Sequence, residues 1–159
     1  MNEGFQTHGS AAVTVMNRLE GWEANLVRNL RLWCDGPLGR SKVCNEYARA
    51  YGAPVAREKV QAFETLVRTI TKHASRPLVR HEVGCSCVGS DECIYLNLIK
   101  TAAAGHLNDA ALIATLLAGP AHAEAIALLA GQVGEGAKRV SYSHSVKKST
   151  HVTNVTRLH

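Results

Sequence analysis

The chain has 159 residues, the usual length of one domain and enough to bury an apolar core without disulfide bonds. Its apolar residues are mostly Ala, Leu, Val and Ile, with only two Phe and two Trp, a composition that favours packed helices over a sheet sandwich. No apolar run approaches the roughly 20 residues of a membrane span. The first ten residues lack the basic and apolar segments of a secretion signal. We therefore expect a soluble, cytoplasmic, all-α protein of one domain.

The net charge of +5 is concentrated near the C-terminal end. All 13 acidic residues lie at or before Glu135, and the segment beyond it carries only basic charges, at Lys138, Arg139, Lys147, Lys148 and Arg157. A basic tail can bind nucleic acid or an acidic partner weakly and in a salt-dependent way, although many such tails are only solvated. The sequence predicts that residues 139–159 form a flexible, disordered tail.

The spacing of apolar residues predicts about six helices between residues 11 and 138, after a flexible N-terminus at residues 1–10. The first is expected over residues 10–33, with Arg28 and Arg31 largely off its apolar stripe, and the turn formers at 35–39 end it. The second and third are expected over residues 41–51 and 54–74.

A fourth helix is expected to begin at Ser90 as its N-cap, with Asp91 and Glu92 as acids of the first turn. Gly105 ends it. The fifth and sixth are expected over residues 108–118 and 121–133, and glycines 131, 134 and 136 are expected to fray the sixth. Because these three helices are rich in Ala and nearly uniform in apolarity, we expect them to form the buried centre, with the first and third covering them.

Four potential soft-metal ligands fall within thirteen residues, between the third and fourth helices: His81, Cys85, Cys87 and Cys93. Thiolate and imidazole ligands suit zinc first, with copper or an iron–sulfur cluster as alternatives. Gly84 and Gly89 would let the backbone bring the close Cys-x-Cys pair onto one ion. The sequence therefore predicts a Cys3His zinc site in a small, non-enzymatic regulatory or interaction protein.

Two other interpretations of the cysteines remain open. Cys87 and Cys93 flank the predicted start of the fourth helix, where unpaired N–H groups and the helix dipole would stabilise a thiolate. One could then be the attacking thiol and the other the resolving thiol of a redox sensor or enzyme. Alternatively, each cysteine is an ordinary small apolar residue of the core.

Two further cysteines lie outside this cluster. Cys34 and Cys44 could replace a weak ligand of the four or bind a second ion. A protein adaptor that uses the basic tail is a further hypothesis.

Overall fold

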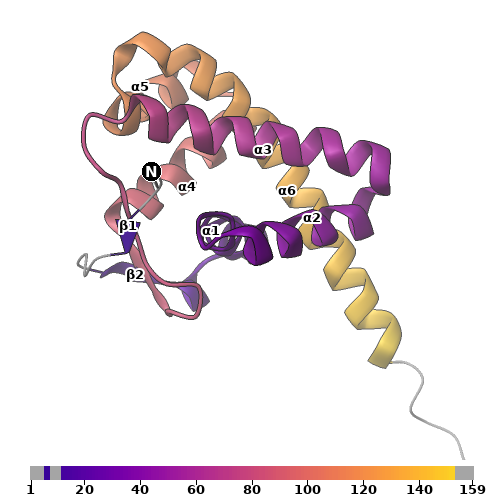
Figure 1. The fold of residues 1–159 in the computed structure, drawn as a ribbon. Coiled ribbons are helices and arrows are strands. Elements are labelled where there is room, and N and C mark those ends of the chain that lie inside the picture. Colours follow the sequence, from indigo (N-terminus) through magenta and orange to yellow (C-terminus); the bar gives the residue numbers. More distant parts are fainter. Residues whose placement is uncertain (1–5, 8–11, 153–159) are drawn as a thin grey trace, which may run out of the picture.

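One long helix, α6 (Ala123–Val152), contacts all five of the other α-helices in the described part of the chain (Figure 1). The structure is a computed structural model that describes residues 6–7 and 12–152, and the side chains of residues 12–144. It confirms an all-α fold with six α-helices in that part of the chain. The other five are α1 (Gly21–Cys34), α2 (Pro37–Tyr51), α3 (Ala53–His73), α4 (Ser90–Ala103) and α5 (Leu107–Ala118).

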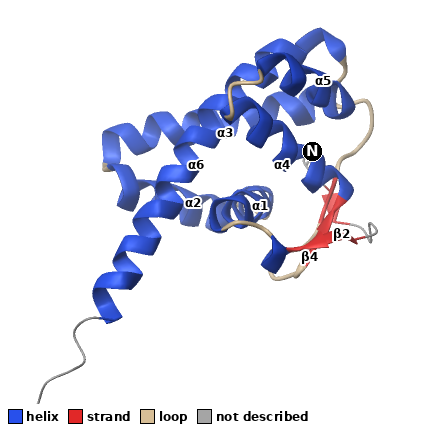
Figure 2. Cartoon of the chain, turned by 180° about the vertical axis from the view of Figure 1, so that it is seen from behind, coloured by secondary structure: helices blue, strands red, loops and turns tan. Residues whose placement is uncertain are grey.

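Short strands lie at one edge of the bundle, where Figure 2 shows β2 and β4. β1 (Gln6–Thr7) pairs in parallel with β3 (Val79–Arg80), and β2 (Ala12–Val15) pairs antiparallel with β4 (Cys87–Gly89). A short 3-10 helix, η1 (Met16–Arg18), joins β2 to α1, and η2 (Pro120–His122) joins α5 to α6. The strands thus tie the N-terminal segment to the connection between α3 and α4.

The first helix begins later than the sequence predicted. Residues 12–15 form β2, and Gly21 is the first residue of α1 rather than a weak point in its middle. β-branched residues at 13–15 suit a strand, and β4 provides a partner that the local pattern does not show. Glu20 is the N-cap, with its own N–H bonded to the side chain of Glu23 at 3.2 Å. Of the predicted flexible residues 1–10, Gln6–Thr7 form β1 and the others lie outside the described residues.

The sixth helix does not end near residue 133 but continues to Val152. It therefore includes residues 139–152 of the predicted tail, whereas residues 153–159 lie outside the described residues. The glycines do not fray it because they pack against neighbouring helices. Gly134 is buried against Ile99 and Ala103 of α4, and Gly136 accepts a hydrogen bond from the Tyr51 hydroxyl of α2 at 2.9 Å. Close packing thus stabilises a helix of low intrinsic propensity.

The predicted buried centre is correct in outline, since α4, α5 and α6 pack on one another. Not every leucine of these helices faces inward, however. Leu112 and Leu116 of α5 are 68% and 63% exposed, and Leu128 of α6 is 57% exposed, while alanines such as Ala110 and Ala114 are buried in their place. Small side chains at the contact let the helix backbones approach closely, which leaves the larger leucines outside. None of the described helices is both long and apolar enough to span a bilayer.

The packing of α6 on α4 predicts opposite effects for two glycine substitutions in the same helix. A Cβ at Gly134 would lie 2.6 Å from the Cβ of Ala103 and 3.0 Å from Cγ2 of Ile99. We therefore expect Gly134→Ala to lower the free energy of unfolding by about 1–3 kcal/mol through overpacking. At Gly136 the nearest atoms are 3.7 Å away, so Gly136→Ala should be neutral or stabilising by about 0.5–1 kcal/mol. Urea unfolding followed by circular dichroism measures both, and similar losses at the two positions would contradict this packing.

Candidate functional site

Three of the four predicted ligands lie between β3 and α4, in a loop that is organised by a buried arginine of α1, and Cys93 lies in the first turn of α4. Arg31 is fully buried and forms an ion pair with Glu92 of α4, which is also fully buried. Nε of Arg31 donates to Oε1 of Glu92 at 2.7 Å, and Nη2 donates to Oε2 at 2.9 Å. This two-pronged geometry is the strong form of an arginine–carboxylate pair.

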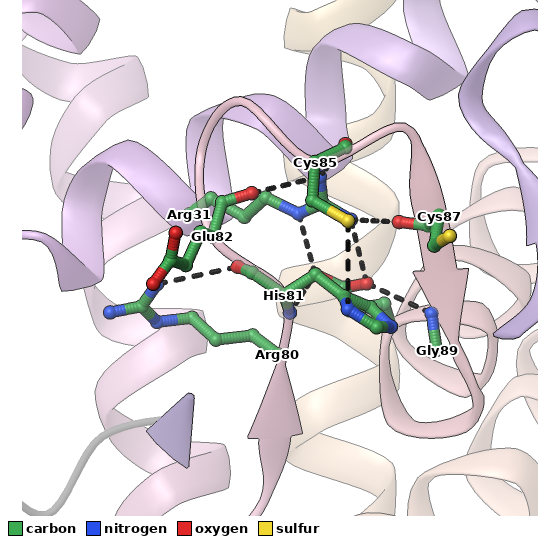
Figure 3. Close-up of polar contacts among 8 residues, drawn as sticks. Arg31, Arg80, His81, Glu82, Cys85, Cys87 and Gly89 are labelled. Carbon is green, nitrogen blue, oxygen red and sulfur yellow. Dashed lines mark hydrogen bonds and ion pairs between the residues drawn. The ribbon is translucent and has the colours of Figure 1, made fainter. Parts of the chain in front are cut away.

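The remaining N–H groups of Arg31 donate to backbone carbonyls of the loop between β3 and α4 (Figure 3). Nη1 donates to the carbonyls of Glu82 at 3.2 Å and Cys85 at 2.7 Å, and Nη2 donates to that of Cys87 at 2.5 Å. A guanidinium has five N–H donors, and all five of those of Arg31 have an acceptor. The side chain therefore fixes both the start of α4 and three carbonyls of the cysteine loop.

Glu92 completes this arrangement from the other side. Its Oε1 accepts a hydrogen bond from the backbone N–H of His81 at 3.1 Å, and its Oε2 accepts one from that of Gly89 at 3.0 Å. Gly89 is the N-cap of α4, so Glu92 does cap the helix as the sequence suggested. The N-cap is however Gly89 rather than Ser90, and the same carboxylate also balances Arg31.

The neighbouring carboxylate fixes the beginning of the loop. Asp91 is buried and accepts hydrogen bonds from both Nη atoms of Arg76, at 2.8 and 2.6 Å, and from the N–H of Val79 at 2.8 Å. The hydrogen bonds from Arg76 hold the pKa of Asp91 below its ordinary value, and the bond from Val79 acts in the same direction. The two acids of the first turn of α4 thus anchor both ends of the loop.

The structure brings two of the four predicted ligands together. Sγ of Cys85 lies 3.8 Å from Nδ1 of His81, and both side chains are partly exposed. A turn at Val83 and Gly84, with the N–H of Cys85 donating to the carbonyl of Glu82 at 3.0 Å, folds the chain back so that these residues meet. Nε2 of His81 is buried and makes no hydrogen bond within the described part of the protein.

The other two predicted ligands stand apart from this pair. In Figure 3 the sulfur of Cys87 points away from Cys85 and His81. Cys93 lies in the first turn of α4, and burial, followed by the charge of Glu92, raises the pKa of its thiol. The pKa of Cys93 is thus shifted in the direction opposite to the one expected for a thiol at a helix start. Across the described residues, no three or more His, Cys, Asp or Glu side chains are grouped as metal ligands.

The five cysteines, all within the described residues, form no disulfide bond. Cys44 lies exposed on α2, and Cys34 is partly buried at the end of α1. Neither contributes to the His81–Cys85 pair, so Cys44 is a useful reference thiol for experiments on the loop.

The sequence did not indicate Arg31 as part of the site. Its position off the apolar stripe of the first helix predicted an exposed side chain, whereas it is the largest fully buried one described. Only the structure shows that Glu92 is buried and therefore needs a cation within reach. Their separation of 61 residues hides that link from any local pattern.

Comparison of the chain with protein-family models, with curated proteins and with solved structures finds no match to any of them. The functional interpretation therefore depends on the geometry and chemistry of the loop itself.

Replacing Arg31 by Met should destabilise the fold by about 3–5 kcal/mol, because Glu92 would be left as a buried, unpaired charge. If the carbonyls of the loop also depend on Arg31, the double variant Arg31→Met with Glu92→Met should recover only part of this loss. Arg57→Met, at an exposed position of α3, is the matched control and should change the free energy of unfolding by about 0.5 kcal/mol or less. Chemical denaturation measures all three. A small effect of Arg31→Met, or complete recovery in the double variant, would contradict the assigned role.

Proposed function

We propose that the protein binds one soft transition-metal ion, zinc first, at the loop formed by residues 81–93, and that it acts as a small regulatory or interaction protein. The supporting observation is the contact between Nδ1 of His81 and Sγ of Cys85. Imidazole and thiolate are preferred zinc ligands, and the two are held by a loop whose backbone is fixed by Arg31 and Glu92.

The spacing of these two atoms suits a shared ion. With zinc–sulfur and zinc–nitrogen bonds of about 2.3 and 2.0–2.1 Å at a tetrahedral angle, the two ligand atoms lie about 3.6 Å apart. The separation in the structure is 3.8 Å. Little movement is therefore needed for His81 and Cys85 to serve as the first two ligands.

Cys87 and Cys93 are the proposed third and fourth ligands. Each is partly exposed and close in sequence to the pair, but neither side chain lies with it in the structure. Zinc coordination by all four residues requires both thiols to turn toward the pair and lose their protons. A metal ion that binds thiolates favours this deprotonation, and the raised pKa of Cys93 moves its coordination toward higher pH.

An interaction role is supported by the outer face of α5. Leu112 and Leu116 lie one helical turn apart, and both are more than half exposed. Exposed apolar side chains that gather on one face often contact a partner. A protein that binds a metal ion at its loop and a partner at its helical bundle could regulate that partner in response to the metal.

The metal hypothesis predicts that protein purified without an affinity tag holds about one equivalent of zinc by elemental analysis. Titration of the metal-free protein with Co²⁺ should give thiolate-to-cobalt charge-transfer absorption. Because the metal ion binds the folded state and not the unfolded state, it should also raise the melting temperature of the protein. Cys85→Ser should lower the charge-transfer absorption, because one of the three thiolate ligands is lost, whereas Cys44→Ser, at the exposed thiol of α2, should leave it unchanged. Wild-type protein that shows neither zinc nor charge-transfer absorption would refute the proposal.

A thiol-based redox sensor is the second candidate, and the same contact favours it. Nδ1 of His81 is placed to accept the proton of Cys85, so Cys85 rather than Cys87 or Cys93 becomes the attacking thiol. A peroxide would oxidise it to a sulfenic acid, and Cys87 could then displace water to give a disulfide.

This candidate predicts that Cys85 reacts with iodoacetamide at neutral pH faster than the exposed Cys44, as mass spectrometry of tryptic peptides would measure. His81→Gln should slow Cys85 and leave Cys44 unchanged. If Cys44 is alkylated faster than Cys85 in the metal-free wild type, the sensor hypothesis fails.

A further inference from the structure

Two histidines meet where the turn between α5 and α6 lies against the end of α3. His73 is the last residue of α3, and His122 is the last residue of η2. Their imidazole rings are stacked, with 3.5 Å between the ring centroids and 23° between the ring planes. Both side chains are partly exposed, so protons from the solvent can reach them. The stack therefore joins two segments that are far apart in the sequence through a pair of titratable groups.

The stack is a favourable contact only while the pair carries at most one extra proton. A neutral imidazole can lie against another neutral ring or against a cation. Two imidazolium ions at this separation repel each other. Within the described part of the chain, neither ring forms a hydrogen bond or an ion pair that would offset the second charge.

The charged groups of the surrounding elements do not neutralise a second proton either. α3 contributes the cation Lys72 beside the stack, and Arg76, just beyond α3, is paired with a carboxylate of α4. The only charged residue of α5 is Asp109, which lies in its first turn, roughly 15 Å along the helix from η2. Glu124 lies in the first turn of α6 but forms no ion pair with either ring among the described side chains.

We infer that the stack of His73 on His122 is a pH-sensitive switch, which holds η2 against the end of α3 until both imidazoles are protonated. Acidification then loosens the turn between α5 and α6. Because proton binding and docking of η2 are coupled, docking opposes the second proton by the same factor as that proton opposes docking. The switch does not depend on metal binding at the cysteine loop.

The pKa of His73 is shifted in the direction that this switch requires. Partial burial, followed by the charges of His122 and Lys72, lowers it from the ordinary value of 6.5. Between the lowered pKa and the ordinary one, the unfolded chain holds more protons than the folded protein, so the free energy of unfolding falls as the pH falls. The contribution of the neutral stack is present above the ordinary pKa and is lost as the pH falls through the lowered one.

Amide exchange measured by NMR at about pH 7.5 and about pH 5, on either side of the histidine range, tests the loosening. The reporter is the N–H of Ala123, which donates to the carbonyl of Pro120 and closes η2. After correction for the intrinsic effect of pH on exchange, its protection should fall at least about fivefold in acid, the lower range of typical coupling.

Substitution of one ring by phenylalanine separates stacking from titration. His122→Phe keeps a stacked ring that cannot take up a proton, and a protonated His73 is attracted to the face of that ring. The acid-induced loss of protection at Ala123 should therefore disappear, and His73→Phe should have the same effect. His106→Gln is the matched control, because His106 is an exposed histidine before α5 and outside the stack, and it should keep the wild-type response.

NMR titration of the histidine side chains gives a second readout of the coupling. The pKa of His73 should be higher in His122→Phe than in the wild type, because the neighbouring charge is absent. An unchanged pKa, or an acid response at Ala123 that is missing from the wild type or retained in His122→Phe, would overturn the inference. All samples contain a chelator, so the inference stands or fails separately from the metal-binding function.

Discussion

The buried ion pair between Arg31 and Glu92 is the interaction on which the rest of the site depends. Burying two charges is costly unless their geometry and remaining hydrogen bonds are satisfied. Here each oxygen of Glu92 accepts two hydrogen bonds, and all five donors of Arg31 are used. The loop supplies several of these partners from its backbone. Its conformation is thus a condition for burying the pair, and the pair in turn fixes where the loop places its side chains.

This dependence links the bundle to the loop chemistry. Arg31 belongs to α1 and Glu92 to α4, so the loop between β3 and α4 is held by two helices of the core. The resulting turn brings His81 and Cys85 to within 3.8 Å, while the N-terminal strand holds Cys87 from the other side. The core helices α1 and α4 hold the loop on one side, and the peripheral strand β2 holds it on the other. The helices fix the first two proposed ligands, and the strand restrains the third.

Much of the fold follows from local sequence, and the exceptions have a common cause. Helical periodicity, Pro54 in a first turn and Gly52 with a φ of 79° place α3 and the end of α2 nearly where the sequence predicts them. The start of α2 was predicted at residue 41, whereas the helix begins at Pro37, within the predicted turn. Two of the predictions are wrong where contacts with residues far away in the sequence determine the local structure. Residues 12–15 become a strand because β4 pairs with them, and α6 continues past Gly134 because α4 packs against it. The candidate site shows the same pattern: proximity in sequence indicated His81 and Cys85, but Arg31, 54 residues from Cys85, could not be recognised locally.

X-ray absorption at the zinc edge of the zinc-loaded protein tests most directly whether this anchored loop presents sulfur and imidazole to one ion. The expected first shell contains imidazole nitrogen at about 2.0–2.1 Å and sulfur at about 2.3 Å. Cys85→Ser should reduce the sulfur contribution, while Cys44→Ser should not. A shell made only of oxygen and nitrogen in the wild type would show that the cysteine loop is not a metal site.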